Sequence, residues 1–231
     1  MVLANLNFNQ LNKITNQSID SIGGITLISI DDTRRYLIKI IFKQCLQKRL
    51  TIFEEFAVIK KLNEAGCIYC PTAYCIGELT FKELREGNLI PERMAEIFAM
   101  NPISSSDKFK YMIQDFVKGN YAENVRDCLP AIFNQKKHGV YQGDIKQCHT
   151  RIDPKTGICK LIDYDQAIYL DPAVTTLSDD EFLMYQFNQK ENLSFGKLSY
   201  RAALRDRIHR LEPHTLQSPQ KQQGVLMEKV C

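Results

Sequence analysis

Two stretches contain the most informative residues of the chain: Tyr141-Gln-Gly-Asp-Ile-Lys-Gln-Cys-His149 and Lys160-Leu-Ile-Asp-Tyr-Asp165. In the first stretch, Asp144 follows a glycine in a predicted turn. In the second, Asp163 closes a short apolar strand. The turn-forming run Asp153-Pro-Lys-Thr-Gly157 separates the two stretches. Asp144 and Asp163 are therefore the candidate functional pair.

The N-terminal part of the chain predicts strands. Ile25–Ile30 and Tyr36–Phe42 are rich in β-branched and aromatic residues. The run Asp31-Asp-Thr33 predicts the turn between them. Asn16–Gly24 is polar and ends in two glycines, so it predicts a flexible loop before the second strand.

A helix is predicted over Thr51–Ala65, where apolar residues recur at helical spacing. Thr51 and Glu54 are spaced as a capping box, and Gly66 ends the helix. The later segments alternate between extended and helical patterns. They are an extended return over Pro71–Gly77, a helix within Pro91–Met100, a strand over Lys110–Val117, a helix over Ala122–Lys137 that stops at His138-Gly139, a strand over Ile158–Ile162, and helices over Ser178–Gln189 and Ser199–Leu211. Strands first and helices later are typical of an α+β protein.

The composition indicates an ordinary globular protein. The chain has 231 residues, of which 44% are hydrophobic and 25% charged, and its formal net charge is +3. This charge is too small to favour nucleic acid as a partner. The best apolar stretch, Tyr36–Phe42, is interrupted by Lys39 and is too short to cross a bilayer, which leaves only peripheral membrane contact open. The first residues lack the features of a secretory signal, so we expect a cytoplasmic protein.

Eight cysteines are scattered along the chain rather than framed for disulfides. Reduced thiols are the expectation for a chain with a core of its own and no signal. The alternative is a zinc site that includes Cys67, Cys70 and Cys75, but a second CxxC or a pair of histidines is missing.

Four charged residues occur in the order that phosphoryl transfer needs. Lys39 lies inside a predicted strand, Glu55 on the following helix, and Asp144 and Asp163 in the two later stretches. Phosphoryl transfer depends on charge neutralisation and alignment more than on covalent chemistry. A strand lysine oriented by a helix carboxylate can hold phosphates. One aspartate can accept or orient the acceptor hydroxyl, and the other can hold magnesium.

The two stretches resemble the catalytic and metal-binding loops of the protein-kinase-like superfamily. Within it, the chain is most similar to the bacterial lipopolysaccharide inner-core kinases, which phosphorylate heptose or Kdo. Their catalytic loop can carry Cys-His where protein kinases place an asparagine, as Cys148-His149 does. Their metal aspartate can lie in a sequence such as Ile162-Asp-Tyr-Asp-Gln-Ala167. The helix run Glu55–Leu62 is also similar to theirs, and the likeness covers roughly residues 25–170.

The resemblance implies a two-lobed protein-kinase-like fold, with a sheet-rich N-lobe over residues 1–117 and a short helical C-lobe over 118–211. The prolines and glutamines of residues 212–231 predict a mobile tail after it. It also implies an ATP- and magnesium-dependent kinase that transfers the γ-phosphate to a hydroxyl group. The implied site residues come from both lobes. They are Asp144 as the base with Lys146 at the transferred phosphate, Lys39 with its partner Glu55 as the phosphate clamp, Ser21, Gly23 and Gly24 as further phosphate contacts, Gln114, Asp115, Phe116 and Val117 as the adenine linker, and Asp163 with His149 at the metal.

The acceptor and the activity are left open. A bacterial envelope saccharide is the first interpretation of the acceptor. Lys146 resembles serine/threonine protein kinases, so a minimal protein kinase, including a secreted bacterial effector, is the second. Gln142 replaces the usual histidine, and His149 offers a nitrogen that magnesium ligates poorly, so a pseudokinase binding module is the third. A non-kinase α+β protein is the last. Lys43 and Glu54 are rivals for the positions of the strand lysine and its partner.

Overall fold

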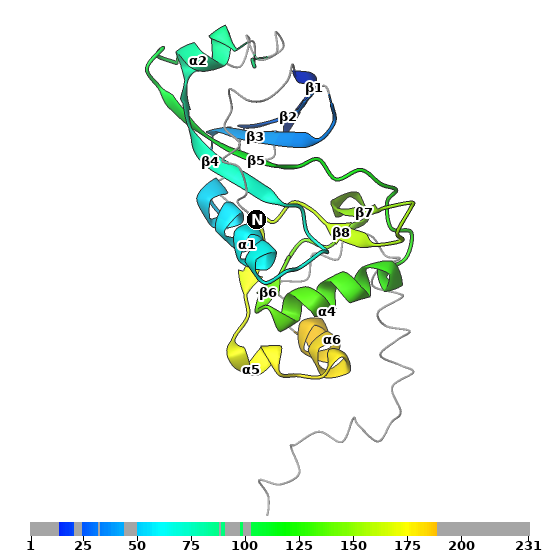
Figure 1. Cartoon of the computed structure of the whole chain (residues 1–231). Helices are drawn as coiled ribbons and strands as arrows, with labels where there is room; N and C mark the ends of the chain where they lie inside the picture. Colours follow the sequence, from blue (N-terminus) through cyan, green and yellow to red (C-terminus); the bar gives the residue numbers. More distant parts are fainter. Residues whose placement is uncertain are drawn as a thin grey trace, which may run out of the picture.

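An antiparallel sheet of five strands forms one end of the molecule (Figure 1). The computed structural model describes residues 14–20, 25–31, 33–43, 50–87, 89–90, 98 and 103–188. The strands lie in the order β1-β2-β3-β5-β4. Their bounds are β1 Ile14–Asp20, β2 Ile25–Asp31, β3 Tyr36–Lys43, β4 Ala73–Thr80 and β5 Lys108–Asp115.

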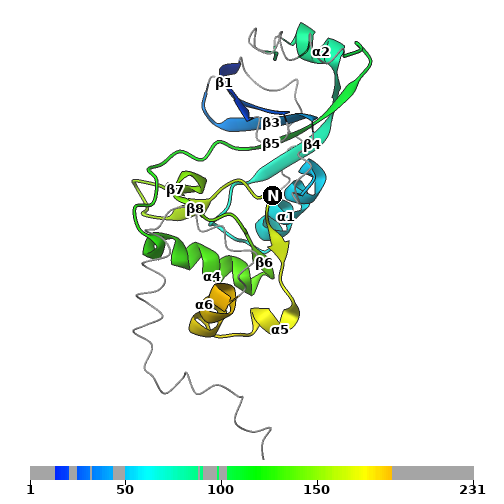
Figure 2. The same ribbon diagram turned by 180° about the vertical axis from the view of Figure 1, so that it is seen from behind.

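Helices and short strands form the other end. Figures 1 and 2, seen from opposite sides, both place α4, α5 and α6 away from the sheet, with α1 and the β7–β8 hairpin between. The α-helices are α1 Ile52–Glu64, α2 Phe81–Glu86, α4 Leu129–Lys137, α5 Pro172–Thr175 and α6 Asp179–Asn188. The 3-10 helices are η3 Val125–Cys128 and η4 Gln147–His149, and the short strands are β6 Val140–Tyr141, β7 Thr150–Ile152, β8 Cys159–Leu161 and β9 Ile168–Tyr169. β6 pairs with β9, and β7 pairs with β8, in both cases antiparallel.

The side chains of β3 point alternately to the two faces of the sheet and so contribute to two different hydrophobic clusters. Ile38 and Ile40 are fully buried in a cluster on one face of the sheet. Ile41 packs on the opposite face, against the larger cluster that α1 and the helical end share. Because side chains alternate along a strand, Lys39 lies on the same face as Ile41. This places the lysine toward α1.

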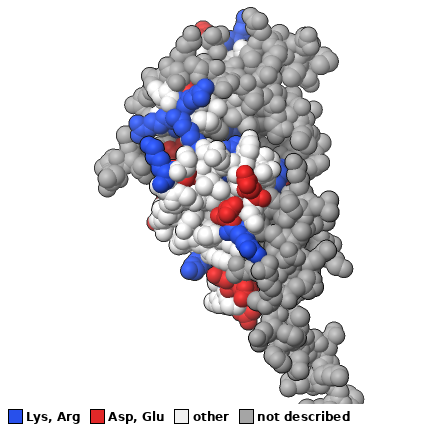
Figure 3. Space-filling view, turned by 90° about the vertical axis from the view of Figure 1, so that its right-hand side faces the viewer, with Lys and Arg blue, Asp and Glu red and all other residues white. Residues whose placement is uncertain are grey.

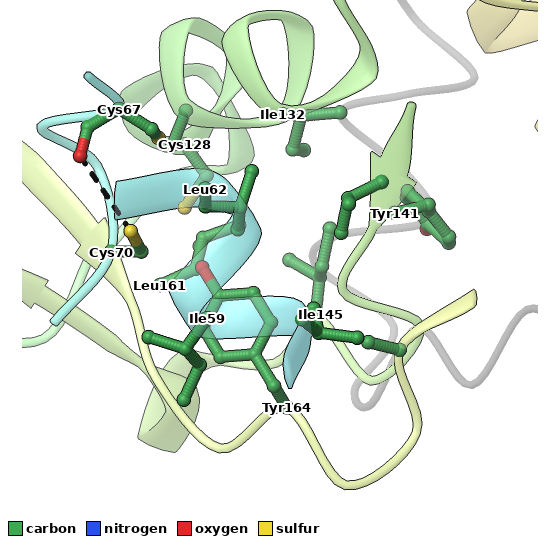
Figure 4. Close-up of a cluster of buried hydrophobic side chains, with 14 of the residues drawn as sticks. Ile59, Leu62, Cys67, Cys70, Cys128, Ile132, Tyr141, Ile145, Leu161 and Tyr164 are labelled. Atoms are coloured by element: carbon green, nitrogen blue, oxygen red, sulfur yellow. Dashed lines mark hydrogen bonds between the residues drawn. The ribbon is translucent and has the colours of Figure 1, made fainter. Parts of the chain in front are cut away.

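The larger cluster joins α1 to the helical end (Figure 4). Ile59 and Leu62 of α1 lie near Leu161 of β8 and the ring of Tyr164, and all four side chains are fully buried. The hydroxyl of Tyr164 is bonded to the Gln135 amide at 2.6 Å, so the buried phenol is satisfied. The segment that carries Asp163 is therefore anchored on both sides by packed side chains.

Several sequence predictions are confirmed. The strands over Ile25–Ile30 and Tyr36–Phe42 are β2 and β3, and the helix over Ser178–Gln189 is α6. α1 begins after the capping box of Thr51 and Glu54. Gly66 follows its C-cap with φ +76°, a left-handed conformation that glycine adopts at least cost.

Two predictions are wrong in part. The loop predicted over Asn16–Gly24 is the strand β1 as far as Asp20, because backbone pairing with β2 does not depend on apolar side chains. The helix predicted over Ala122–Lys137 begins only at Leu129, after η3. Pro130 lacks an N–H and is tolerated only in the first turn of a helix.

Other boundaries move by a few residues. β4 continues to Thr80, and β5 ends at Asp115 rather than at Val117. The sequence reading missed α2, which starts with its own capping box of Thr80 and Glu83. Outside the described residues lie the helix predicted over Ser199–Leu211, the tail over 212–231 and all of Pro91–Met100 except Phe98.

The capping box of α1 gives a first prediction. Thr51→Ala should lower the free energy of unfolding by about 1 kcal/mol, because the Glu54 N–H loses its side-chain acceptor. Thr51→Ser keeps the hydroxyl and should remain within about 0.5 kcal/mol of the wild type. Urea unfolding of the three proteins measures this. An equal loss in both variants would contradict the role of the hydroxyl.

Candidate active site

A buried ion-pair network joins the sheet, α1 and the segment after β8. The Lys39 Nζ lies 2.8 Å from Glu55 Oε2 and 3.1 Å from Asp163 Oδ1. Burial alone would lower the pKa of Lys39, but the carboxylates of Glu55 and Asp163 raise it above its ordinary value. Lys39 is therefore held as a cation. Burial raises the pKa of Glu55, and the attraction of Lys39 opposes that shift.

Glu55, and not Glu54, is the glutamate that pairs with the strand lysine. Glu54 is exposed and accepts from the N–H of Thr51 at 2.7 Å, so it belongs to the cap of α1. Glu55 is only 2% exposed and contacts Lys39. Among the two, the helix therefore turns Glu55 inward.

Asp163 occupies a constrained backbone position. Its φ is +62°, and within the described residues only Arg34 shares a positive φ among non-glycine residues. Strained conformations of this kind persist where the surroundings impose them, often at functional sites. Burial alone would raise the pKa of the Asp163 carboxyl, but Lys39 and His149 hold it below its ordinary value.

Gln142 ties the two quoted stretches together. Its amide Nε2 donates to the carbonyl oxygens of Ile162 at 2.9 Å and of Asp163 at 2.6 Å. Its Oε1 accepts from the N–H of Asp144 at 2.8 Å. The residue that departs from the resembled pattern therefore links the backbones that carry both candidate aspartates.

Asp144 is 2% exposed and is surrounded by donors. Lys146 Nζ lies 2.7 Å from its Oδ2, and the Gln166 amide donates to the same oxygen at 3.2 Å. Burial by itself would lower the pKa of Lys146, but Asp144 raises it. The sequence reading assigned no role to Gln166. Its only signal was its place in the stretch that follows Asp163.

His149 lies between the two aspartates. Its Nδ1 is 2.9 Å from the Asp144 carbonyl oxygen and 3.3 Å from Asp144 Oδ2. Its Nε2 is 3.2 Å from Asp163 Oδ2. The imidazole therefore bridges the carboxylates that the sequence places in separate stretches.

The carboxylate of Asp163 is suited to a hard cation such as magnesium, provided that the cation takes its other oxygen ligands from water and substrate. No group of three or more metal-binding side chains occurs among the described residues. Magnesium commonly uses one or two carboxylates together with water and substrate phosphates, rather than a full protein cage. The Asp163 side chain, which is 34% exposed, can supply such a ligand. The nitrogen of His149 is less suited to magnesium.

The predicted adenine linker spans the end of β5. Gln114 is 6% exposed, and its Oε1 has no hydrogen-bond partner among the described residues. The N–H groups of Asp115 and Phe116 donate to Thr72 and Arg35 carbonyls at 2.9 Å each. Val117 follows with its backbone outside the strand. A buried carbonyl oxygen without a donor thus marks this edge of the site.

The remaining candidate residues are those outside the described part of the chain and three cysteines. Ser21, Gly23 and Gly24 lie outside the described residues, as does the side chain of Lys43. Cys67 and Cys70 lie in the larger cluster, where Cys70 Sγ is 3.6 Å from the Cys67 carbonyl oxygen (Figure 4). Cys75 packs against the other cluster. The three cysteines therefore do not form one zinc site.

Comparisons with known proteins give little further information. No protein-family description matches the chain, and no curated protein does. Among solved structures, the chain is similar to the kinase PK-1 of the Cydia pomonella granulovirus, at 12% identity and a TM-score of 0.40 over 68% of this chain. It spans 54% of the viral kinase, about half its length. No helix in the described ranges combines the length and hydropathy of a membrane span.

Gln142 provides a second prediction. Gln142→Glu keeps the acceptor for Asp144 but points a carboxylate oxygen at two carbonyls, so the free energy of unfolding should fall by about 2–4 kcal/mol at neutral pH. Burial and these carbonyls should raise the pKa of the new carboxyl in the folded state. The loss should therefore be largest above that pKa and shrink as the pH falls, because the protonated acid can donate again.

The matched control for this change is Gln147→Glu on η4, which should alter the stability by no more than about 0.5 kcal/mol. Urea unfolding at neutral and acidic pH measures both variants. Equal effects of the two substitutions, or a loss for Gln142→Glu that does not depend on pH, would contradict the linking role.

Gly143 provides a third prediction. Its φ is +84°, and an added Cβ would lie 1.9 Å from the carbonyl oxygen of Gln166. Gly143→Ala should cost about 3–5 kcal/mol of stability, the sum of a left-handed penalty and a steric one. Gly157, with φ +70° and no atom within 4 Å of an added Cβ, is the control. Gly157→Ala should cost only about 1–2 kcal/mol. Thermal unfolding of both variants decides, and similar losses would refute the close approach.

Proposed function

We propose that the protein is an ATP- and magnesium-dependent phosphotransferase with a two-lobed protein-kinase-like fold, an N-lobe over residues 1–117 and a C-lobe over 118–211. One observation carries the proposal. The buried Lys39 is held between Glu55 and Asp163, while Gln142 and His149 connect Asp163 to Asp144. A charged cluster of this kind is suited to holding and aligning phosphate groups.

Lys39 would bind the nucleotide phosphates, with Glu55 fixing its direction. The adenine would lie against the segment from Gln114 to Val117. The Gln114 Oε1, which has no partner among the described residues, can accept a hydrogen bond from the exocyclic amine of adenine. That bond would satisfy a buried polar atom and so favours a purine at this edge.

Asp163 would hold the magnesium ion, which supplies charge neutralisation for the phosphates when bound. His149 keeps the Asp163 carboxylate oriented through the 3.2 Å contact to its Oδ2. Lys39 lies 3.1 Å from the other oxygen, Oδ1. The two cationic or donating groups therefore leave the carboxylate ionised and fixed.

Asp144 would act on the acceptor. It takes the proton of the attacking hydroxyl as the oxygen–phosphorus bond forms, and the bond from the γ-phosphorus to the bridging oxygen breaks, leaving ADP. Lys146, 2.7 Å from Asp144, is close enough to neutralise charge on the transferred group.

The proposed acceptor is a hydroxyl of a bacterial envelope saccharide. The similarity of Cys148-His149 and of Ile162–Ala167 to the saccharide kinases supports this choice. A second candidate is a serine/threonine protein kinase. The contact between Lys146 and Asp144 favours that candidate, since the same pair of residue types is typical of those enzymes.

Transfer from γ-labelled ATP in the presence of magnesium tests the function. Asp144→Asn and Asp163→Asn should each reduce transfer by about 10²- to 10⁴-fold, because one loses the base and the other the metal ligand. Glu123→Gln removes one exposed acidic charge outside the site and should leave the rate unchanged within about twofold.

The acceptor is identified in the same assay by fractionation. Label in a glycolipid fraction supports the saccharide acceptor, and label on protein bands supports the second candidate. Nucleotide binding without transfer to either fraction would reduce the protein to a binding module. No nucleotide binding, or full transfer by Asp144→Asn, would overturn the phosphotransferase proposal.

A further inference from the structure

A basic hollow of about 510 Å³ lies between the β2–β3 turn, the segment after β5 and the β7–β8 hairpin. Lys39, Asp144 and Asp163 do not line it, but Asp115, Phe116 and Val117 of the proposed adenine linker do, so the hollow shares that segment with the candidate active site and not its charged cluster. A volume in this range is typical of sites for small molecules. We call it the basic hollow and define it by the cationic residues on its wall: Arg34, Arg35, Lys118, Arg151, Lys155 and Lys160.

The charge of the basic hollow is concentrated and of one sign. Six cationic side chains line it against two carboxylates, those of Asp115 and Asp153. The whole chain has a net charge of only +3. Figure 3 shows that lysine and arginine side chains gather on one part of the molecular face rather than spreading evenly. A concave basic surface of this kind attracts anions.

The two carboxylates of the wall are engaged by neighbouring groups. Asp115 accepts from the N–H of Thr72 at 3.0 Å and from the hydroxyl of Tyr74 at 2.6 Å. Asp153 accepts from the N–H of Lys155 at 2.8 Å, and such backbone hydrogen bonds hold its pKa below the ordinary value. Neither carboxylate forms an ion pair with a lysine or arginine of the described part of the chain.

The six cations likewise have no carboxylate partner within 4.0 Å in the described ranges, whereas Lys82 and Lys108 elsewhere do. Two of them are backed by aromatic rings: Arg35 lies 5.2 Å from the ring centre of Tyr36, and Arg151 lies 4.6 Å from that of Tyr121. These stacks restrict the guanidinium groups without neutralising them.

The backbone beneath the cations is fixed. The buried Asp31 carboxylate accepts from the N–H groups of Arg35 at 2.8 Å and Tyr36 at 2.7 Å. Arg34 lies inside the turn that these hydrogen bonds close, and its φ is +52°, a conformation that non-glycine residues rarely adopt. The Phe116 N–H donates to the Arg35 carbonyl, which joins this turn to the segment after β5. The cations are thus presented by a preorganised surface.

We propose that the basic hollow binds a compact polyanion carrying two or more phosphate groups. Guanidinium groups match phosphate oxygens through paired hydrogen bonds, and two or more phosphates are needed to offset the excess of cations. The phosphates can belong to a free sugar phosphate or to a lipid headgroup, since the recognised chemistry is the same. The site does not depend on phosphotransferase activity.

Calorimetric titration of the full chain, with a chelator to exclude metal-dependent binding, tests the proposal. The probes are fructose 1,6-bisphosphate, fructose as its neutral counterpart, and phosphatidylcholine vesicles with and without phosphatidylinositol bisphosphate. Saturable binding of the bisphosphate sugar, or of only the vesicles that contain the phosphorylated lipid, is expected. The first result identifies a free sugar phosphate as the source and the second a lipid headgroup.

Two triple variants with the same change of charge locate the binding. Replacing the exposed Arg34, Lys118 and Lys155 by glutamine should weaken binding by at least about tenfold. Replacing the exposed Lys82, Lys108 and Lys137 by glutamine should change it by less than about twofold. Thermal unfolding verifies that both variants fold. Equal weakening in both variants, or no saturable binding of any phosphorylated probe, would overturn the proposal.

Discussion

The structure depends on one buried cation, the Lys39 ammonium, and on the two carboxylates that neutralise it. Lys39 comes from β3, Glu55 from α1 and Asp163 from the segment after β8, so three distant parts of the chain meet at a single charge. A buried charge is tolerated only when it is paired, and removing one partner of such a pair costs about 3–5 kcal/mol. The pairing therefore restricts how the sheet, α1 and the helical end can be arranged.

Around that charge, neutral groups set the geometry of the two candidate aspartates. The amide of Gln142 donates to the backbone of the Asp163 stretch and accepts from the backbone of Asp144. Gly143 allows the two stretches to approach to a distance that a side chain would prevent. A glutamine can perform this linking with an amide that stays uncharged at all ordinary pH values. Its presence is thus compatible with an intact site.

Sequence patterns predicted the elements that local physics controls. The spacing of hydrophobic residues and the helix-capping pattern predicted β2, β3, α1 and α6. Both signals act within a few residues of the chain, as the Thr51 capping box shows. They failed at β1, whose polar residues form a strand only through pairing with β2. The order of Lys39, Glu55, Asp144 and Asp163 suggested the site. The bridging by His149 and the contact of Gln166 depend on loop conformations that no local pattern encodes.

In the proposed function, Lys39 and Asp163 act as one unit that binds a magnesium nucleotide. Calorimetric titration with a non-hydrolysable ATP analogue, with and without magnesium, tests it most directly. Magnesium should strengthen binding to the wild type by at least about tenfold, and Asp163→Asn should remove that gain while weaker metal-free binding remains. If the analogue does not bind, or if magnesium does not change its affinity for the wild type, Lys39 and Asp163 do not form a magnesium-nucleotide site.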